Sequence, residues 1–482
     1  MSGFLNILAG AAGAMSRLDV IAHEIAKWKQ STARKRMIDG KRYYLGEHDI
    51  IDRNRTVIGR DGLLEVVKNL PNNKIIDNQY TKMVDQKVNY LLGQPVAFDS
   101  ENEEYADNLN DVFDRNFHRT FKAVGESSLN GGMGWLHPYY DEDGEFCFKR
   151  FEPTEILPFW KDAAHTRLDF GVRLYEVDAY DGRRETVIEK VEIYTIDGIE
   201  RYVLQEGKLI EDIESPATPY IDNDGTAYNW TKVPLIAFKY NNTETPLITR
   251  VKSLQDSINT MLSDFQNNMQ EDSRNTILVI KNYDGQDLAE FRHNLAAYGA
   301  VKVRSTTDGS GGVDTLQVNV NAENYKAILQ LLKKALIESA MGYDAKDDRL
   351  MGSPNQMNIM SMFSDIDLDA NNMETEYQAA FDDLLWFVNM HLSNTGKGDY
   401  KADEVTVVFN RDMLMNEGDI IDNIVKSQAV LSKQTLIAQH PWIDDVDAEM
   451  ERVETEKENN MENFMSTFTT NNDGSGEDNA ER

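Results

Sequence analysis

Residues 246–269 read PLITRVKSLQDSINTMLSDFQNNM, and apolar side chains recur in this stretch at steps of three and four. These side chains are Leu247, Val251, Leu254, Ile258, Met261, Phe265 and Met269. The spacing predicts a helix with a narrow apolar stripe, which suits packing against neighbouring helices. Such a helix would be roughly 35 Å long.

The same spacing returns at residues 325–339, which read YKAILQLLKKALIES. In this second stretch Tyr325, Ile328, Leu332, Leu336 and Ser339 resume the spacing. Gly342 follows, and we expect it to end the helix in the left-handed conformation that glycine adopts most easily. The sequence therefore predicts two long helices that flank one compact insert.

The insert between the two helices contains the flexible sequence DGSGG at residues 308–312. Residues 276–280 and 300–303 have the composition of short strands, and residues 286–298 that of a helix. We therefore predict that the insert folds as a small α/β module.

Two further regions complete the predicted secondary structure. From residue 135 to residue 205 the apolar pattern alternates with period two and is punctuated by Asp-Gly turns, which predicts an antiparallel meander. Ser353 and Pro354 then mark the start of a helix of about 40 residues, ~60 Å long. Asp365, Asp367 and Asp369 break its helical period, so we expect a kink there. The predicted fold class is α+β.

The C-terminal part is acidic and helical from residue 416 onward. Its apolar positions predict a small helical bundle around Trp442. Residues 471–482 contain almost no apolar side chains, and we expect this tail to be disordered.

The composition of the chain argues against several classes of function. The chain has 482 residues, enough for roughly three domains, and its net charge is −32. This charge argues against a protein that wraps nucleic acid or adheres to an anionic membrane. Cys147 is the single cysteine, which excludes an internal disulfide and favours a cytosolic origin. No segment has the ~20 apolar residues of a membrane span, so we expect no membrane partner.

The familiar catalytic patterns are incomplete. His23 and Glu24 begin a zinc-protease motif, but Lys27 stands where the second histidine is needed. The three aspartates at 365, 367 and 369 could bind Mg²⁺, yet alternate residues of a helix point about 200° apart. We therefore expect no catalytic residue, no metal site and no cofactor.

The order of these parts, and several short stretches, resemble the portal proteins of tailed double-stranded DNA bacteriophages, in the siphovirus branch that infects Gram-positive hosts. The stretches are YYLGEHDI at 43–50, NNKIIDN at 72–78, YLLGQP at 90–95, YDEDG at 140–144, VPLI at 233–236, SLQD at 253–256, SD at 263–264 and HPW at 440–442. None is specific alone, but their order and spacing are, over nearly the whole chain.

The resemblance implies the phage portal fold in a ring oligomer, with parts that follow one another along the chain. These are an N-terminal region with a β-rich and helical wing (1–244), a first stem helix (245–274), a clip (275–320), a second stem helix (321–341), a tunnel loop (342–357), a long kinked wing helix with a strand (358–415), a helical crown (416–470) and a disordered tail (471–482).

The resemblance also implies a function. A portal protein forms a dodecameric ring at one capsid vertex of the virion, after assembly in the host cytoplasm. The ring is the channel for DNA packaging by terminase and for DNA exit, and the platform for head completion and tail attachment. The implied partners are further copies of the chain, the terminase large subunit, head-completion or connector proteins, the major capsid and scaffolding proteins, and double-stranded DNA in the channel.

Two sets of residues become candidates for this function. Lys333, Lys334, Lys346 and Arg349 would face DNA in the channel, although the first two lysines could instead form salt bridges between subunits. Leu254, Ile258, Met261 and Phe265 would be buried between subunits of the ring and not in the core of one subunit.

Two other functions compete with the portal. A minor capsid or head-assembly protein would share the acidity and the lack of catalytic motifs, but it would not need the order of stem, clip and tunnel loop. A metal-dependent nuclease would need clustered carboxylates, which the sequence does not supply.

Overall fold

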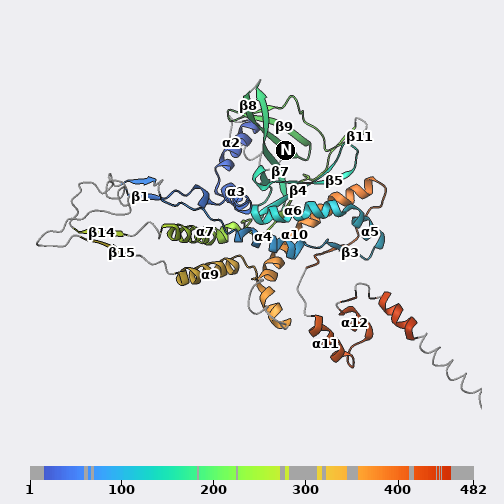
Figure 1. The fold of residues 1–482 in the computed structure, drawn as a ribbon. Coiled ribbons are helices and arrows are strands. Elements are labelled where there is room, and N and C mark those ends of the chain that lie inside the picture. The colour runs from blue at the N-terminus through green and yellow to red at the C-terminus, as the bar shows by residue number, and fades with distance from the viewer. Residues whose placement is uncertain are drawn as a thin grey trace, which may run out of the picture. The chain divides into compact units, whose positions relative to one another are not determined.

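The computed structural model describes most of the chain, and two compact units can be distinguished in it (Figure 1). The described residues are 16–58, 63–66, 70–181, 184–223, 226–271, 277–281, 312–316, 322–344, 356–411, 417–440, 442–443, 446 and 448–457. The first unit comprises Met1–Tyr343 and Asp365–Asp412, and the second comprises Asp344–Ser364 and Met413–Arg482. Helices and antiparallel sheets are mixed throughout the first unit, which confirms the predicted α+β class.

Two helices open the first unit, α2 (Arg17–Lys29) and α3 (Thr32–Tyr44). Ser16 caps α2 in a capping box, because its hydroxyl accepts from the backbone of Asp19 while the Asp19 carboxylate accepts from the backbone of Ser16. Ser31 caps α3 in the same way, through the backbone N–H of Arg34. Both helix starts are thus encoded locally.

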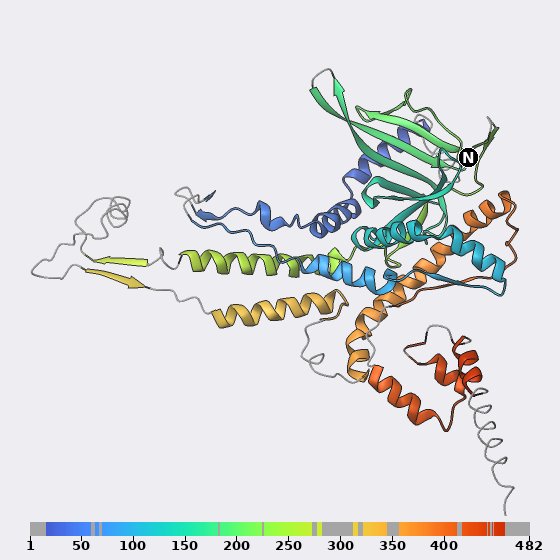
Figure 2. The ribbon, with the colours of Figure 1, turned by 45° about the vertical axis from the view of Figure 1, so that its right-hand side comes forward.

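Five antiparallel strands form the largest sheet, in the order β10-β9-β8-β7-β6 (Figure 2). The strands are β6 (Ile156–Trp160), β7 (Leu168–Asp181), β8 (Arg184–Thr195), β9 (Gly198–Gln205) and β10 (Lys208–Glu211). Neighbours in sequence are neighbours in space, so the predicted meander is confirmed from residue 156 onward, whereas the strands between residues 133 and 151 belong to another sheet. Ile21, Ile25 and Trp28 of α2 pack on this sheet and complete a core with Phe159 and Phe170.

A second sheet joins β13 (Ile236–Lys239), β4 (Met133–Tyr140) and β5 (Phe146–Phe151), in that order. Helix α6 (Arg115–Gly131) packs on it. Gly132 ends α6 with φ +86°, and a Cβ there would lie 2.2 Å from the backbone oxygen of Glu244. Both the conformation and the space therefore require glycine.

The long helix α10 (Gln356–Asn394) is one of the longest elements of the structure. Residues 365–369 are helical throughout. The kink expected at the three aspartates therefore does not divide α10 into two helices. Its buried side chains within the first unit include Ile366, Ala370, Met373, Tyr377, Phe381, Leu384 and Val388. Tyr377 and Phe381 meet Phe121 of α6 and Phe238 of β13 in an aromatic cluster.

Smaller elements connect these layers. They are η1 (Asp49–Asp52), β1 (Thr56–Ile58), β2 (Leu64–Val66), α4 (Gln79–Leu92), β3 (Ala97–Asp99), α5 (Glu103–Val112), η2 (Pro153–Glu155), β11 (Ile221–Asn223), β12 (Thr226–Tyr228) and β16 (Thr406–Val408). β1 pairs with β2, β11 with β12, and β3 with β16, each pair antiparallel.

The two long helices predicted from the apolar stripes are present as α7 (Ile248–Glu271) and α9 (Ala322–Ser339). They lie side by side (Figure 1, Figure 2). Beyond them, β14 (Ile277–Lys281) pairs antiparallel with β15 (Gly312–Leu316), a strand that the sequence did not reveal. The expected helix at 286–298 and strand at 300–303 lie outside the described residues.

The second unit contains α11 (Glu417–Ser427) and α12 (Lys433–Ala438). Trp442, the expected centre of a bundle, is 69% exposed, so that prediction is wrong. The physical reason is length, because α12 has six residues and none of them is buried. No described helix of either unit is long and apolar enough to cross a bilayer.

The buried histidine His137 on β4 predicts a dependence of stability on pH. Its Nδ1 donates to the Pro234 carbonyl at 2.6 Å, and burial lowers the pKa of His137 to about 4. The folded-state pKa of His137 lies below its unfolded value. The contribution of this residue to the free energy of unfolding should therefore be fully present above about pH 6.5 and be lost as the pH falls from about 6.5 to 4. The expected loss is on the order of 3 kcal/mol in urea unfolding.

The variant His137→Asn is the matched control for this effect, since the amide retains a donor but does not titrate. It should unfold with a shallower pH dependence than the wild type over the same range. Equal slopes for the two proteins would contradict the assignment to His137.

Candidate functional site

A row of polar side chains is buried on one face of α7. It consists of Gln255, Asn259, Ser263 and Asn267, which recur at intervals of four residues. Four residues advance a helix by one turn, so these side chains stack along a single line. We call this row, together with the backbone groups that it binds, the polar ladder.

The partner of the row is the extended segment 71–78. Asn267 Oδ1 accepts from the backbone N–H of Asn73 at 2.7 Å. One turn earlier on α7, Ser263 Oγ accepts from the N–H of Ile75 at 2.9 Å. The segment thus runs antiparallel to the helix.

The same pattern continues toward the start of α7. Asn259 Oδ1 accepts from the N–H of Asp77 at 3.1 Å. Gln255 Oε1 accepts from the N–H of Tyr80 at 3.0 Å, and its Nε2 donates to the Asp77 carbonyl at 2.8 Å. Four helical residues advance about 6 Å and two extended residues about 6.6 Å, so the periods nearly match. Side chains of α7 thereby provide the hydrogen-bond acceptors that a neighbouring strand would provide in a sheet.

The ladder is braced by His48, which is buried and stacks on the Tyr43 ring at 4.4 Å. The Tyr43 carbonyl can only accept, so His48 Nε2 carries the proton and donates to it at 3.0 Å. Nδ1 then accepts from the Asn259 amide at 2.7 Å. Burial lowers the pKa of His48, which favours this neutral form.

Charged groups beside the ladder join α3 and η1 to α7. The Tyr43 hydroxyl donates to Asp256 at 2.5 Å and accepts from Lys252 at 3.0 Å. Lys252 also forms ion pairs with Asp49 and Asp256. Two of the stretches that carried the family resemblance, at 43–50 and 253–256, therefore meet in space.

One residue of the predicted apolar stripe, Ile258, lies in a different environment from the one that we expected. Ile258 is 0% exposed in the single chain, because α3, α4 and α9 pack against α7. It therefore lies in the core of the subunit and has no surface to offer to another subunit. Leu254, Met261 and Phe265 are half-buried, and the Phe265 ring lies 5.0 Å from that of Tyr325 on α9.

A buried carboxylate forms the second part of the site. Asp369 of α10 is 4% exposed, and it accepts from Lys87 Nζ at 2.7 Å, from the Tyr240 hydroxyl at 2.7 Å and from Arg250 at 3.0 Å. Burial alone would raise the pKa of Asp369, but Lys87, Tyr240 and Arg250 together hold it below its ordinary value. We call these four residues the Asp369 cluster.

The other two aspartates of the predicted triplet do not join this cluster. Asp367 forms an ion pair with Arg411 and accepts from the Tyr90 hydroxyl at 3.1 Å, and Asp365 is exposed. Within the described parts of the chain, no three His, Cys, Asp or Glu side chains are grouped so that they could hold a metal ion.

The end of α9 is anchored to α4 beside the Asp369 cluster. The N–H of Gly342 donates to the Ile337 carbonyl at 3.0 Å, as in a Schellman motif. The left-handed residue is Met341, with φ +54°, and not Gly342 as predicted. Gly342 packs closely on α4, because a Cβ there would lie 2.6 Å from Met83 Sδ and 2.9 Å from Gln86 Oε1 and would displace the ends of these side chains.

The structure places two of the candidate DNA-facing residues on α9. Lys333 forms an ion pair of 2.5 Å with Asp77 of the same chain. Lys334 is 75% exposed and lies 3.9 Å from Glu338. Both ion pairs lie within one chain, and the salt bridges between subunits that the sequence suggested for these lysines stay a prediction. Lys346 and Arg349 lie outside the described residues.

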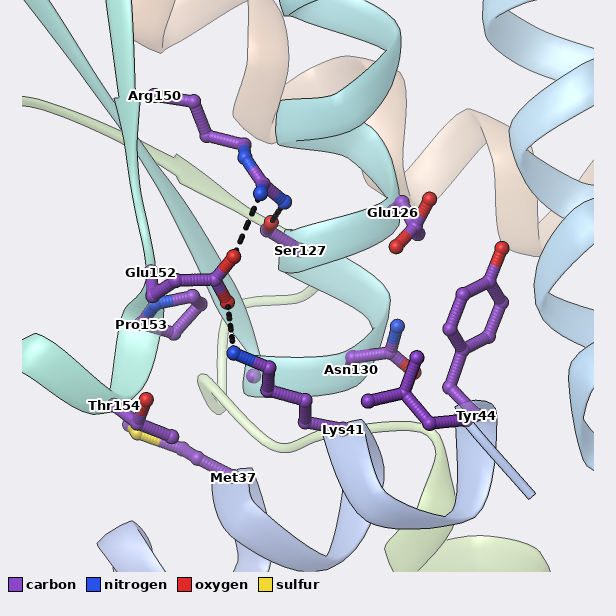
Figure 3. Close-up of a pocket in the computed structure, with 12 residues that line it drawn as sticks. Met37, Lys41, Tyr44, Glu126, Ser127, Asn130, Arg150, Glu152, Pro153 and Thr154 are labelled. Atoms are coloured by element: carbon purple, nitrogen blue, oxygen red, sulfur yellow. Dashed lines mark hydrogen bonds and ion pairs between the residues drawn. The ribbon is translucent and has the colours of Figure 1, made fainter. Parts of the chain in front are cut away.

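A pocket of about 180 Å³ lies between α3, α6 and the region of β5 and η2 (Figure 3). Arg150 binds Glu152 at 2.6 Å and the Ser127 hydroxyl at 2.9 Å, and Glu152 also binds Lys41 at 3.2 Å. Glu126 lies across the pocket from these ion pairs, and burial raises its pKa. The ion pairs connect α3 to β5, which is a structural role.

Comparison with known proteins agrees with this architecture. Residues 24–463 match the family model described as phage portal protein, SPP1 Gp6-like. The chain belongs to the phage portal protein family. It is 30% identical over 426 residues to the portal protein of Bacillus phage SPP1, which covers 87% of this chain and 83% of that protein.

A second portal relative comes from Clostridium phage phiCD119. It is 27% identical over 430 residues, which cover 86% of this chain and 91% of the relative. Both host genera are Gram-positive, so the predicted family and branch are confirmed.

Sequence reasoning missed the polar ladder and the Asp369 cluster. For the ladder a signal was present, since Gln255, Asn259, Ser263 and Asn267 repeat every four residues within an apolar pattern. For the cluster there was none, because Lys87 and Asp369 are far apart in sequence and carry no motif.

The polar ladder predicts a loss of stability in the variant Ser263→Ala. The change leaves the partly buried N–H of Ile75 without its acceptor, which should cost about 1 kcal/mol of unfolding free energy. Ser257→Ala is the matched control, since both hydroxyls donate to the carbonyl four residues earlier but Ser257 is exposed. Urea unfolding of both variants measures the difference, and equal losses would contradict the ladder.

The Asp369 cluster predicts a larger effect for Asp369→Asn. Removing the carboxylate charge leaves Lys87 buried without its anionic partner, which should cost about 3–5 kcal/mol. Asp365→Asn, on the exposed side of the same helix, should change stability by less than about 0.5 kcal/mol. Thermal unfolding compares the two, and a mild effect of Asp369→Asn would show that the cluster contributes little.

Proposed function

We propose that the protein forms a dodecameric ring at one capsid vertex, and that this ring is the channel through which terminase packages double-stranded DNA. The observation that carries the proposal is the match of residues 24–463 to the phage portal family. The same channel would release DNA and would serve as the platform for head-completion and tail proteins.

The long helix pair supports an assignment of parts within this proposal. α7 and α9 would be the stem, and β14 with β15 would belong to the clip. The wing would contain the two sheets and α10, residues 342–357 would be the tunnel loop, and the acidic residues 416–470 the crown. Leu254, Met261 and Phe265 remain candidates for contacts between stems.

The charge of the protein suits a channel that lets DNA slide. A net charge of −32 on each subunit, repeated around a ring, repels phosphate and keeps DNA from adhering. This electrostatic argument favours a conduit over a DNA-binding protein and needs no catalytic group.

Negative-stain images of the purified protein test the proposal directly. We expect closed rings with a central hole. A uniform population of monomers at micromolar concentration would contradict the ring.

A charge-reversal variant tests the DNA-facing residues. Because Lys333 is paired with Asp77, the informative set is Lys334→Glu, Lys346→Glu and Arg349→Glu together. Added negative charge along the channel should slow packaging and shorten the packaged DNA. Lys82→Glu on α4 is the control, and normal DNA length in the triple variant would remove these residues from the channel.

A further inference from the structure

The junction between α9 and α4 holds one residue in a strained conformation. Met341 has φ +54°, and a residue with a side chain pays about 1–2 kcal/mol in this left-handed region. Strain of this kind persists where surrounding contacts enforce it, and it is common at switch regions. Here the contacts that enforce it can be named.

Two neighbouring side chains of α4 bind the residues that follow α9. Gln86 Oε1 accepts from the Tyr343 N–H at 3.1 Å, and Gln86 Nε2 donates to the Tyr343 carbonyl at 3.0 Å. Lys87 Nζ donates to the Met341 carbonyl at 3.0 Å. Arg250 of α7 lies 3.7 Å from Met341 Sδ. The backbone at the end of α9 is thus held on both sides of Gly342.

These contacts depend on a close approach that Gly342 allows. Met83 and Gln86 lie where a side chain at position 342 would be. If Met341 returned to the right-handed region, α9 could continue past Ser339, and the carbonyl of Met341 and the backbone of Tyr343 would leave α4. The docked and released arrangements are therefore mutually exclusive.

Opposing contributions to the free energy act on the two arrangements. Release breaks the hydrogen bonds to Gln86 and Lys87, but it relieves the strain at Met341 and permits new bonds within α9. Lys87 keeps its ion pair with Asp369 in both arrangements, so release leaves no buried charge without a partner. A two-state element needs this kind of balance.

We propose that Gln86 and Lys87 form a latch, which is the set of hydrogen bonds that holds the end of α9 on α4. The conformational strain at Met341 opposes these hydrogen bonds. Because Lys87 also binds Asp369 of α10, the latch couples α9 to α10 and α7. The regulatory role rests on the proposed function, in which α9 lines the channel. The existence of the latch itself is independent of that function.

Hydrogen–deuterium exchange of the assembled protein tests the latch with two substitutions at position 341 that should change the exchange rate in opposite directions. Met341→Gly relieves the left-handed strain and should slow exchange of the Tyr343 amide at least threefold. Met341→Ile places a β-branched residue where it is most disfavoured and should speed exchange at least tenfold. Both variants lose the Arg250 contact, so they are matched. Equal protection in the two variants would overturn the latch.

Gln86→Leu tests the other side of the contact, with Asn89→Leu on the exposed side of α4 as control. Exchange should accelerate at residues 341–343 in Gln86→Leu and remain unchanged in α7 and the five-stranded sheet. Acceleration everywhere would show general destabilisation and would overturn a local latch.

The role in packaging has its own measurement. Particles assembled with Met341→Gly, which favours the docked form, should contain at most half the normal amount of DNA. Normal DNA content with altered exchange would show that the latch exists but does not act in packaging. Failure of the wild-type protein to form rings would instead count against the proposed function.

Discussion

The buried carboxylate of Asp369 is the interaction on which the first unit depends. It binds groups from α4, from the residue after β13 and from α7, while itself belonging to α10. A carboxylate in this position is stable because three donors compensate for its lost hydration. The cluster therefore fixes where the helix pair α7 and α9 meets the rest of the unit, and Lys87 extends this control to the end of α9.

The polar ladder solves a different problem along the same helix pair. An extended segment that lies against a helix has backbone N–H groups with no neighbouring strand, and each unpaired buried group costs about 1–3 kcal/mol. The near-equality of four helical residues and two extended residues lets Asn259, Ser263 and Asn267 satisfy these groups in turn. Specific hydrogen bonds thus hold α7 in one register against residues 71–78, which apolar contacts alone would not select.

These two arrangements suit the proposed assignment of the helix pair as a stem. A helix pair attached only by apolar packing could slide or rotate, since hydrophobic contacts are non-directional. Hydrogen bonds and buried ion pairs are directional, so the ladder and the Asp369 cluster resist both motions. Met341, one of four described non-glycine residues with a positive φ, lies beside the Asp369 cluster, where its carbonyl accepts from Lys87.

The sequence by itself determined the secondary structure of the helix pair, the antiparallel meander and the family. Apolar side chains at steps of three and four specify a helix and its buried face, and alternation specifies a strand, because these periods are local properties of the backbone. The quoted stretches at 43–50, 72–78 and 253–256 carried the family resemblance for the same reason, since they are contiguous in the chain.

Only the tertiary structure decided which element covers each face. Ile258 has the spacing of an interface residue, yet it is already fully buried within one chain. Gly342 has the sequence signature of a left-handed cap, yet Met341 adopts that conformation and Gly342 packs against Met83. Lys87 and Asp369 meet across the fold with no local signal. A sequence pattern encodes the polarity and period of an element, whereas the identity of its partner depends on contacts between residues that are distant in the chain.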